Sequence, residues 1–215
     1  MKVLPIFNLY EKSYICNGLE VSSYEEAAKY MADCVVDNAL EFFTDEKMKN
    51  SEAVKKWYEN MPNATPEVIN RYQNENCKSD LKEVSDEINK IRCRFSETQQ
   101  VIHAGNLPEK NFITKRPLSA TLDMQVAFRE AEFCGKTYND NEINIYELTV
   151  KDSKTSVFVT NPESEHGNEK EVIFSAGATI EILTKKTIKK DYKVFSNDGK
   201  KSKLVPINYI KAIIS

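Results

Sequence analysis

The first hundred residues place apolar side chains at helical spacing. One run advances by three or four residues at each step and so marks one face of a helix: Ala28, Met31, Val35, Ala39 and Phe42. Ser23 and Glu26 precede this run at the spacing of a capping box, in which two side chains satisfy free backbone N–H groups of the first turn. The pattern predicts a helix that begins at Ser23 and carries the whole run.

Three more helices are expected before residue 98. Apolar faces with the same spacing extend from Val54 to Met61 and from Leu81 to Phe95. Pro62 ends the first of these helices, because proline has no N–H to donate, and Ser79 opens the second. Thr65-Pro66 is a favourable cap and first-turn pair for a helix between them. These faces indicate packing against a core.

From about residue 99 the apolar runs shorten, as is typical of strands. The expected strands are 100–103, 118–122, 143–150, 155–159, 169–174, 178–184, 192–195 and 204–214. Asp123 is placed to cap a helix that continues to Phe133, and Ser175-Ala176-Gly177 would form a hairpin turn. Helices followed by strands predict an α+β fold, with an N-terminal helical segment (1–98) packed on a mixed, sandwich-like β core (99–215) in one compact unit.

Composition narrows the class of partner. The net charge is −3, so no overall positive field favours nucleic acid or anionic lipid. The lysines between 185 and 203 form a local basic cluster, which is either a solvated rim or a patch for an acidic partner or nucleic acid. The five cysteines are scattered without a C-x-x-C pair, which predicts reduced cysteines and no metal site. No membrane span or secretory signal is recognised, so we expect a cytoplasmic protein, in its own cell or a host's.

Two acidic residues in the strand-rich part of the chain have side chains that can take part in catalysis. Glu169 and Glu171 are two positions apart in an expected strand, so their side chains should project from the same face. Carboxylates this close repel each other, which raises one pKa and suits the pair to different protonation roles. A carboxylate beside a sugar also stabilises an oxocarbenium-like transition state, as in glycoside cleavage. The pair is therefore a candidate catalytic site.

Three segments, taken in order, resemble the arginine–serine–glutamate class of mono-ADP-ribosyltransferases. They are Val101-Ile102-His103-Ala104-Gly105, then Leu118-Ser119-Ala120-Thr121-Leu122-Asp123, and finally Glu169-Lys170-Glu171-Val172-Ile173-Phe174 with its Ser-Ala-Gly turn. In that family a first strand ends in Arg, a second carries Ser-Thr-Ser before Leu-Asp, and a third carries Glu-x-Glu or Gln-x-Glu. The resemblance covers residues 99 to 215 and implies a fold that binds NAD outside any Rossmann motif.

The resemblance also implies a role for each residue. Glu171 would bind the 2′-hydroxyl of the nicotinamide ribose and stabilise the oxocarbenium ion. Glu169 would orient or deprotonate the nucleophile of a protein substrate, since a Glu at this position goes with arginine acceptors in the family. Ser119 would hydrogen-bond the catalytic carboxylate, and Thr121 would support the same region. Residues 162–168 would form the substrate-recognition turn, in which His166 is expected to be solvated without a special role.

The first motif departs from the family, because His103 stands where an Arg is usual. Histidine offers at most two donors and is only partly charged at neutral pH. Diphtheria-toxin-like and poly-ADP-ribose-polymerase-like relatives use such a His, with a nearby Gly, to contact the adenosine ribose, and His103-Ala104-Gly105 would bind the cofactor in this way. Arg116 is a substitute ligand for the phosphates of NAD or a surface arginine.

Four interpretations stay open on the sequence. The first is a bacterial or phage mono-ADP-ribosyltransferase that modifies a protein with NAD as co-substrate. The second is a catalytically degenerate protein of the same fold, acting as a binding or inhibitory module, since His103 replaces the usual Arg. The third is an NAD glycohydrolase, with water as acceptor. The fourth is an unrelated α+β protein in which the three motifs occur by chance.

Overall fold

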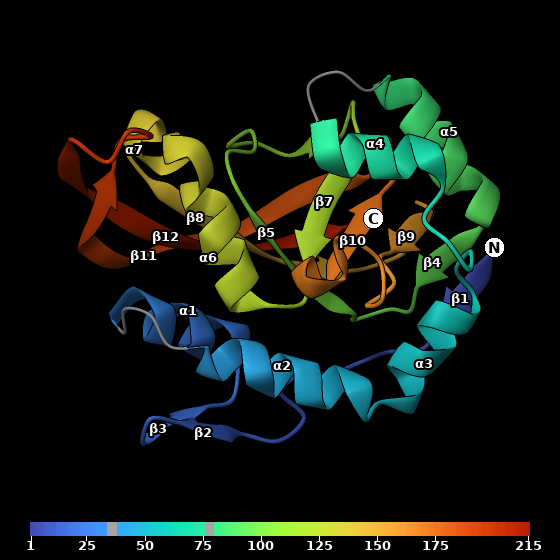
Figure 1. Ribbon diagram of the computed structural model, residues 1–215, viewed down its shortest axis with the longest axis horizontal. Coiled ribbons are helices and arrows are strands. Elements are labelled where there is room, and N and C mark those ends of the chain that lie inside the picture. The colour runs from blue at the N-terminus through green and yellow to red at the C-terminus, as the bar shows by residue number, and fades with distance from the viewer. Residues whose placement is uncertain (34–37, 76–79) are drawn as a thin grey trace.

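The computed structural model describes residues 1–33, 38–75 and 80–215. It is an α+β fold built on a mixed sheet, as the sequence predicts (Figure 1). The strands of this sheet are β5 (Gln100–Ala104), β6 (Phe112–Ile113), β7 (Leu118–Thr121), β8 (Ile143–Val150), β9 (Val157–Val159), β10 (Glu171–Phe174), β11 (Thr179–Phe195) and β12 (Ser202–Ile214). Their spatial order is β6-β11-β12-β8-β5-β7-β10-β9.

The sheet is almost divided between β5 and β7. These neighbours share one residue pair, Ile102 with Thr121, whereas β5 pairs with β8 along its full length, from Gln100 to Ala104. Beyond the shared pair the two strands separate, so their exposed edges face each other across a gap. This separation positions the candidate site.

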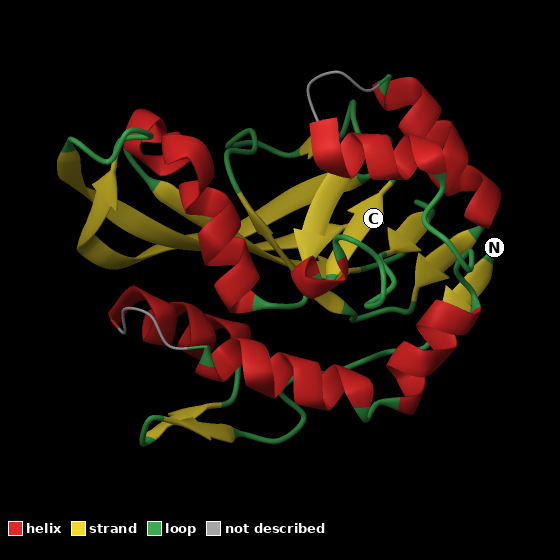
Figure 2. Cartoon of the chain, in the orientation of Figure 1, coloured by secondary structure: helices red, strands yellow, loops and turns green. Residues whose placement is uncertain are grey.

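Helices flank the strands on several sides (Figure 2). They are α1 (Tyr24–Asp33), α2 (Ala39–Lys49), α3 (Glu52–Glu59), α4 (Glu67–Glu75), α5 (Leu81–Ile91), α6 (Met124–Glu132) and α7 (Lys136–Asp140), with 3-10 turns η1 (Phe133–Gly135) and η2 (Gly167–Glu169). Helix α6 packs on β5, β7 and β8, α1 packs on β11 and β12, and α5 packs on β9 and β10. Among the described residues, no helix combines the length and the apolar character needed to cross a membrane.

The N-terminal segment shares its core with the sheet. Trp57 is fully buried, and its indole N–H donates to the carbonyl of Pro5 at 2.7 Å. The side chain of Gln99 accepts from Phe7 N at 2.8 Å and donates to Phe7 O at 3.0 Å. Strands β1 (Lys2–Leu4) and β4 (Cys93–Phe95) pair in parallel, which ties the two ends of the segment together. The bonds of Gln99 cross the expected boundary at residue 98, and buried residues on both sides of it form one hydrophobic core.

The long first helix that the sequence predicts is two helices. Helix α1 ends at Asp33 and α2 begins at Ala39, and the expected core residue Val35 lies outside the described residues. The capping box holds in part: the Ser23 hydroxyl accepts from Glu26 N at 3.2 Å. The Glu26 carboxylate, however, accepts from the backbone N–H of Ser22 at 2.7 Å, one residue earlier than the motif requires.

The predicted helix from Ser79 to Phe95 is also shorter than expected. Ser79 lies outside the described residues, and Asp80 is the N-cap, its carboxylate accepting from Lys82 N at 2.9 Å. The helix ends at Ile91 because Arg92 adopts a left-handed conformation with φ 58°. Phe95 therefore belongs to β4, a strand that helical periodicity cannot reveal. A further unexpected hairpin joins β2 (Tyr14–Cys16) to β3 (Leu19–Val21).

The turn at residues 175–177 does not form the predicted hairpin. Strand β10 pairs with β7 and β9, whereas β11 pairs with β12 and β6 near the other edge of the sheet. The expected strands at 178–184 and 192–195 are parts of β11, which is continuous for 17 residues. Its lysine-rich middle lacks an apolar alternation because most of its side chains are exposed, and pairing with β12 holds it extended.

Candidate active site

A cleft of about 780 Å³ opens where β5 and β7 separate. Its walls come from these two strands, from α4 and α6, and from the turn that precedes β10. All eight residues that the sequence nominates line it: His103, Ala104, Gly105, Arg116, Ser119, Thr121, Glu169 and Glu171. The structure therefore brings together side chains from three separate motifs.

Glu171 begins β10 on the wall of the cleft. It lies opposite Thr121 of β7, so Ser119, two residues away on β7, shares its face of the sheet. Its Oε2 accepts a hydrogen bond from Gln73 Nε2 at 2.7 Å, and the Ser119 hydroxyl is a second partner. Burial raises the pKa of the Glu171 carboxyl, while these two donors oppose the rise. The result is a shielded carboxyl group held in a fixed orientation.

Glu169 shares the cleft with Glu171, but not as neighbours on one strand. The prediction that both lie in a strand is wrong, because Glu169 ends η2 and Lys170 is left-handed, with φ 50°. The side chain of Lys170 is 4% exposed, and its Nζ lies 2.9 Å from Asp45 and 3.1 Å from Asp123. These ion pairs favour a turn at Lys170 over an extended chain.

Thr121 anchors this turn. Its hydroxyl donates to the carbonyl of Glu169 at 2.8 Å and accepts from the backbone N–H of Asp123 at 3.1 Å. Gly167 makes the turn possible, because a Cβ at this position would lie 2.1 Å from the Pro162 carbonyl oxygen. Only glycine fits such an approach without moving the backbone.

His103 bridges the gap between the two strands. Its Nδ1 lies 2.7 Å from the carbonyl oxygen of Ser119, which can only accept, so Nδ1 carries the hydrogen. Burial lowers the pKa of His103 to about 4. The imidazole is therefore neutral at neutral pH. Gly105, with φ +143°, lets the chain pass close by: a Cβ there would lie 3.3 Å from His103 Nε2.

Two cations lie at the rim of the cleft. Arg116, just before β7, and Lys136, at the start of α7, both line it and are both exposed. Their positive charges add to the lowering of the pKa of His103. Lys136 is a candidate that sequence reasoning missed, because no motif marks it.

Sequence reasoning also missed the contribution of α4. Tyr72, Gln73 and Asn74 line the cleft, although they lie outside the segment that resembles the family. His166, expected to be solvated, has a side chain only 16% exposed, with its ring between Asn74 and Glu169. Nothing in the sequence marks α4, since its contacts to Glu171 span 98 residues.

No protein-family model matches the sequence, and no curated protein is significantly similar to it. The fold is similar to that of BECa, an ADP-ribosylating toxin of C. perfringens crystallised with NADH, with 12% identity, a TM-score of 0.47 and coverage of 84% of this chain. The chain spans 50% of BECa.

Two further structures are similar to this chain. The Vis toxin from Vibrio splendidus is 13% identical, with a TM-score of 0.42 and coverage of 89% of this chain and 85% of Vis. An ADP-ribosyltransferase from Clostridium botulinum is 14% identical, with a TM-score of 0.42 and coverage of 77% of this chain and 96% of that enzyme. Identities and TM-scores this low show a similar fold alone, so any function has to be argued from the side chains of the cleft. All three structures are ADP-ribosyltransferases, the family that the sequence motifs resemble.

Proposed function

We propose that this protein transfers ADP-ribose from NAD to a protein. The observation that carries the proposal is Glu171, a half-buried carboxyl group on the wall of a large cleft, oriented by Gln73 and Ser119. A carboxylate in such a place stabilises positive charge that develops beside it, because little water is available to screen the interaction. The bond between ribose and nicotinamide is a glycosidic bond whose cleavage develops such a charge.

In the proposed reaction the bond between ribose C1′ and the nicotinamide nitrogen breaks, and nicotinamide leaves with the electron pair. Glu171 accepts a hydrogen bond from the ribose 2′-hydroxyl and offsets the charge of the oxocarbenium ion. Gln73 and Ser119 already hold the carboxyl group in place, so little reorganisation accompanies the reaction. The acceptor nucleophile then bonds to C1′.

The rest of NAD would contact β5 and the rim. His103 donates through Nδ1, so its Nε2 has a free lone pair and suits a ribose hydroxyl rather than a phosphate. Arg116 and Lys136 carry the positive charge that the pyrophosphate needs, with Arg116 able to form two parallel hydrogen bonds. The volume of about 780 Å³ is in the range of cofactor sites, and Ala104-Gly105 leaves room for a ribose.

The acceptor would approach from the side of Glu169. Its side chain is 31% exposed, which leaves the carboxylate within reach of a second protein. A carboxylate next to a guanidinium both orients the acceptor and takes its proton, so we propose arginine as the acceptor. Water in the same position would give NAD hydrolysis.

Incubation with labelled NAD and a cell lysate tests the proposal. The wild type should label at least one protein, and Glu171→Gln should label none above background. Once a labelled target is isolated, replacement of its modified arginine by lysine should abolish the labelling. Equal labelling by wild type and Glu171→Gln would contradict the role of Glu171.

A binding module without catalysis is the second candidate, favoured by the neutral His103 where a charged residue would bind phosphate. Isothermal titration with NAD separates the two. NAD binding by wild-type protein that is weakened by Arg116→Gln supports an NAD site. A folded protein that binds no NAD at millimolar concentration supports the module.

A further inference from the structure

Asn74 on α4 fixes the protonation of one nitrogen of His166. The Asn74 amide nitrogen donates to the Asn70 carbonyl oxygen at 3.1 Å and to Asn70 Oδ1 at 3.3 Å. Its Oδ1 is thereby turned to His166 Nε2, 3.2 Å away. An amide oxygen can only accept, so Nε2 carries a hydrogen.

The other nitrogen of His166 faces a carboxylate. His166 Nδ1 lies 3.2 Å from Glu169 Oε1. A neutral imidazole with its hydrogen on Nε2 would present a lone pair to a carboxylate oxygen, and two acceptors repel. The contact is attractive only when a proton lies between Nδ1 and Oε1. An imidazole holds a proton more tightly than a carboxyl group by about two pH units in model peptides, so the proton belongs to the ring.

We propose that His166, held by Asn74, is an imidazolium that positions Glu169 for the acceptor. Its Nδ1–H donates a hydrogen bond to Glu169 Oε1. The other carboxylate oxygen, Oε2, is then free to accept a hydrogen bond from the incoming nucleophile. This inference rests on the proposed function, in which Glu169 receives the acceptor. His166 itself does not touch the reacting atoms and is a positioning residue.

The charges around the ring favour the cation. Three carboxyl groups line this wall: Glu169 in the turn, Glu171 on β10 and Glu130 on α6. Burial raises the pKa of Glu130, the charge of Glu169 raises it further, and Arg129, Lys136 and His166 oppose the rise. A proton on His166 reduces the repulsion among the three acids. The ring is mostly shielded from water, so this effect is not screened away.

Ring nitrogen spectra test the inference directly. The chain contains 2 histidines, and the structure gives them different proton distributions. In ¹⁵N-labelled protein at pH 7, His103 should appear as a neutral ring with its hydrogen on Nδ1. His166 should carry hydrogens on both nitrogens. In Glu169→Gln, whose amide donates to Nδ1, His166 should become neutral with its hydrogen on Nε2. Identical His166 spectra in the two proteins would overturn the inference.

Activity provides a second readout. His166→Ala should lower kcat for transfer to a protein acceptor at least tenfold, as loss of an oriented base does. Release of nicotinamide into water should stay within about twofold, because Glu171 and its two donors are unchanged. Glu59→Gln, an exposed change at the end of α3 and outside the cleft, is the control and should leave both rates as they are. Equal loss of both rates would overturn the positioning role.

The two proposals fail in different ways. If the wild type releases no nicotinamide and labels no protein, the proposed function fails, while the ring spectra still decide where the proton lies. If the wild type is active and His166→Ala transfers ADP-ribose to protein as fast as the wild type, the further inference fails alone. Asn74→Leu, which removes the acceptor at Nε2, should reproduce the transfer defect of His166→Ala.

Discussion

At the scale of single residues, burial of Glu171, the proposed catalytic residue, has a cost in stability. Burial raises its pKa in the folded protein, so the folded state binds the proton more tightly than the unfolded state. The stability that it contributes is therefore present at acid pH and is lost as the pH rises through the folded pKa. At neutral pH the ionised carboxyl group weakens the fold.

This sign predicts the effect of Glu171→Gln on melting. The amide has the same shape and no charge, so Tm at pH 7 should rise by about 2 °C or more. The gain should shrink as the pH is lowered and the wild-type carboxyl group takes up its proton. Scanning calorimetry at neutral and acid pH measures the difference. A Tm that falls at pH 7 would refute this account of burial.

Burial of His103 predicts a pH dependence in the opposite direction. Its pKa is lowered by burial to about 4, so the folded state resists protonation. Stability is fully present above the unfolded pKa of about 6.5 and is lost as the pH falls towards 4, by up to about 3 kcal/mol. His103→Asn keeps a donor for the Ser119 carbonyl and does not titrate. Urea unfolding at neutral and acid pH should show a smaller loss for this variant, whereas His166→Asn should retain the loss. An equal loss of unfolding free energy between neutral and acid pH in wild type and His103→Asn would contradict this role of His103.

The sequence was most informative for residues inside short motifs. Ser119 and Thr121 were nominated from one strand, and Glu171 from another, and the sheet places them on one face. Gln73 and His166 were not, because an amide in a polar helix and a histidine in an acidic loop look the same with or without a partner. Their roles come from contacts across the fold.

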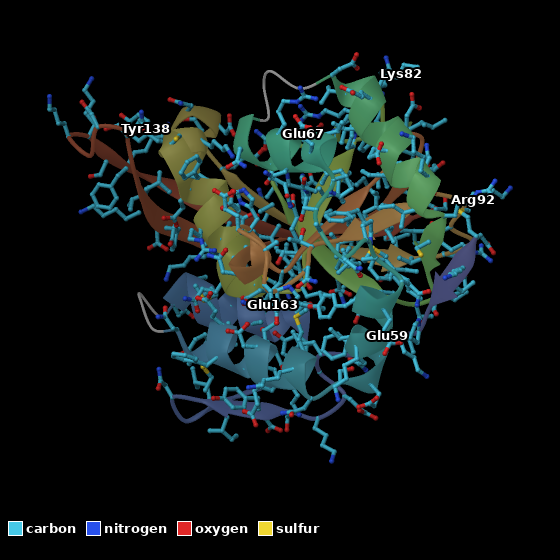
Figure 3. The ribbon with its side chains drawn as sticks, turned by 45° about the vertical axis from the view of Figure 1, so that its right-hand side comes forward. Glu59, Glu67, Lys82, Arg92, Tyr138 and Glu163 are labelled. Atoms are coloured by element: carbon cyan, nitrogen blue, oxygen red, sulfur yellow. The ribbon has the colours of Figure 1, made fainter. Side chains whose placement is uncertain are left out.

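At the scale of elements, helix α4 of the N-terminal segment lines the cleft and contacts Glu171. Figure 3 labels Glu67 at the start of this helix and Glu163 in the turn before β10, the two elements that meet at the cleft. Gln73 donates from α4 to both Glu171, at 2.7 Å, and Thr160, at 3.0 Å. The helix therefore orients the carboxyl group from outside the sheet.

Replacement of Gln73 tests this role. Gln73→Leu removes both donated bonds, each of which contributes about 1 kcal/mol or more when the acceptor is buried or charged. We expect kcat for nicotinamide release to fall about tenfold, with the dissociation constant for NAD nearly unchanged. Glu67→Gln, on the exposed start of the same helix, should have no effect. A Gln73→Leu protein with wild-type kcat would exclude α4 from catalysis.

Elements with a regular apolar period were predictable, and those fixed by distant partners were not. Strand β8 was predicted with its observed bounds, Ile143–Val150, because it is buried on both faces. Helix α6 was predicted from its Asp123 cap, whose carboxylate accepts from Gln125 N at 2.8 Å. The long β11 was divided in two, because its exposed lysines hide a strand that only its pairing with β12 defines.

At the scale of the whole molecule, one buried lysine joins three parts of the chain. Lys170, in the turn before β10, forms ion pairs with Asp45 on α2 and with Asp123, the fully buried cap of α6. The negative charges of Asp123 and Asp45 raise the pKa of Lys170 against the effect of burial, so it stays charged. The division at residue 98 stays a prediction, and this cluster spans it.

Lys170→Met should destabilise the protein by about 3 kcal/mol, because Asp123 would be left buried and unpaired. Asp45 is 57% exposed, so Asp45→Asn should cost less than about 1 kcal/mol. Chemical unfolding of both variants measures the two values. Similar losses of unfolding free energy in the two variants would show that the buried pair with Asp123 contributes no more than the exposed pair with Asp45.

The rate of nicotinamide release from NAD tests the central role of Glu171 most directly, since it needs no knowledge of the protein target. Wild-type protein should release nicotinamide, and Glu171→Gln should lower kcat by at least a hundredfold while still binding NAD. Glu59→Gln, an exposed change on α3 and outside the cleft, should match the wild type. Release by Glu171→Gln at the wild-type rate would contradict the account.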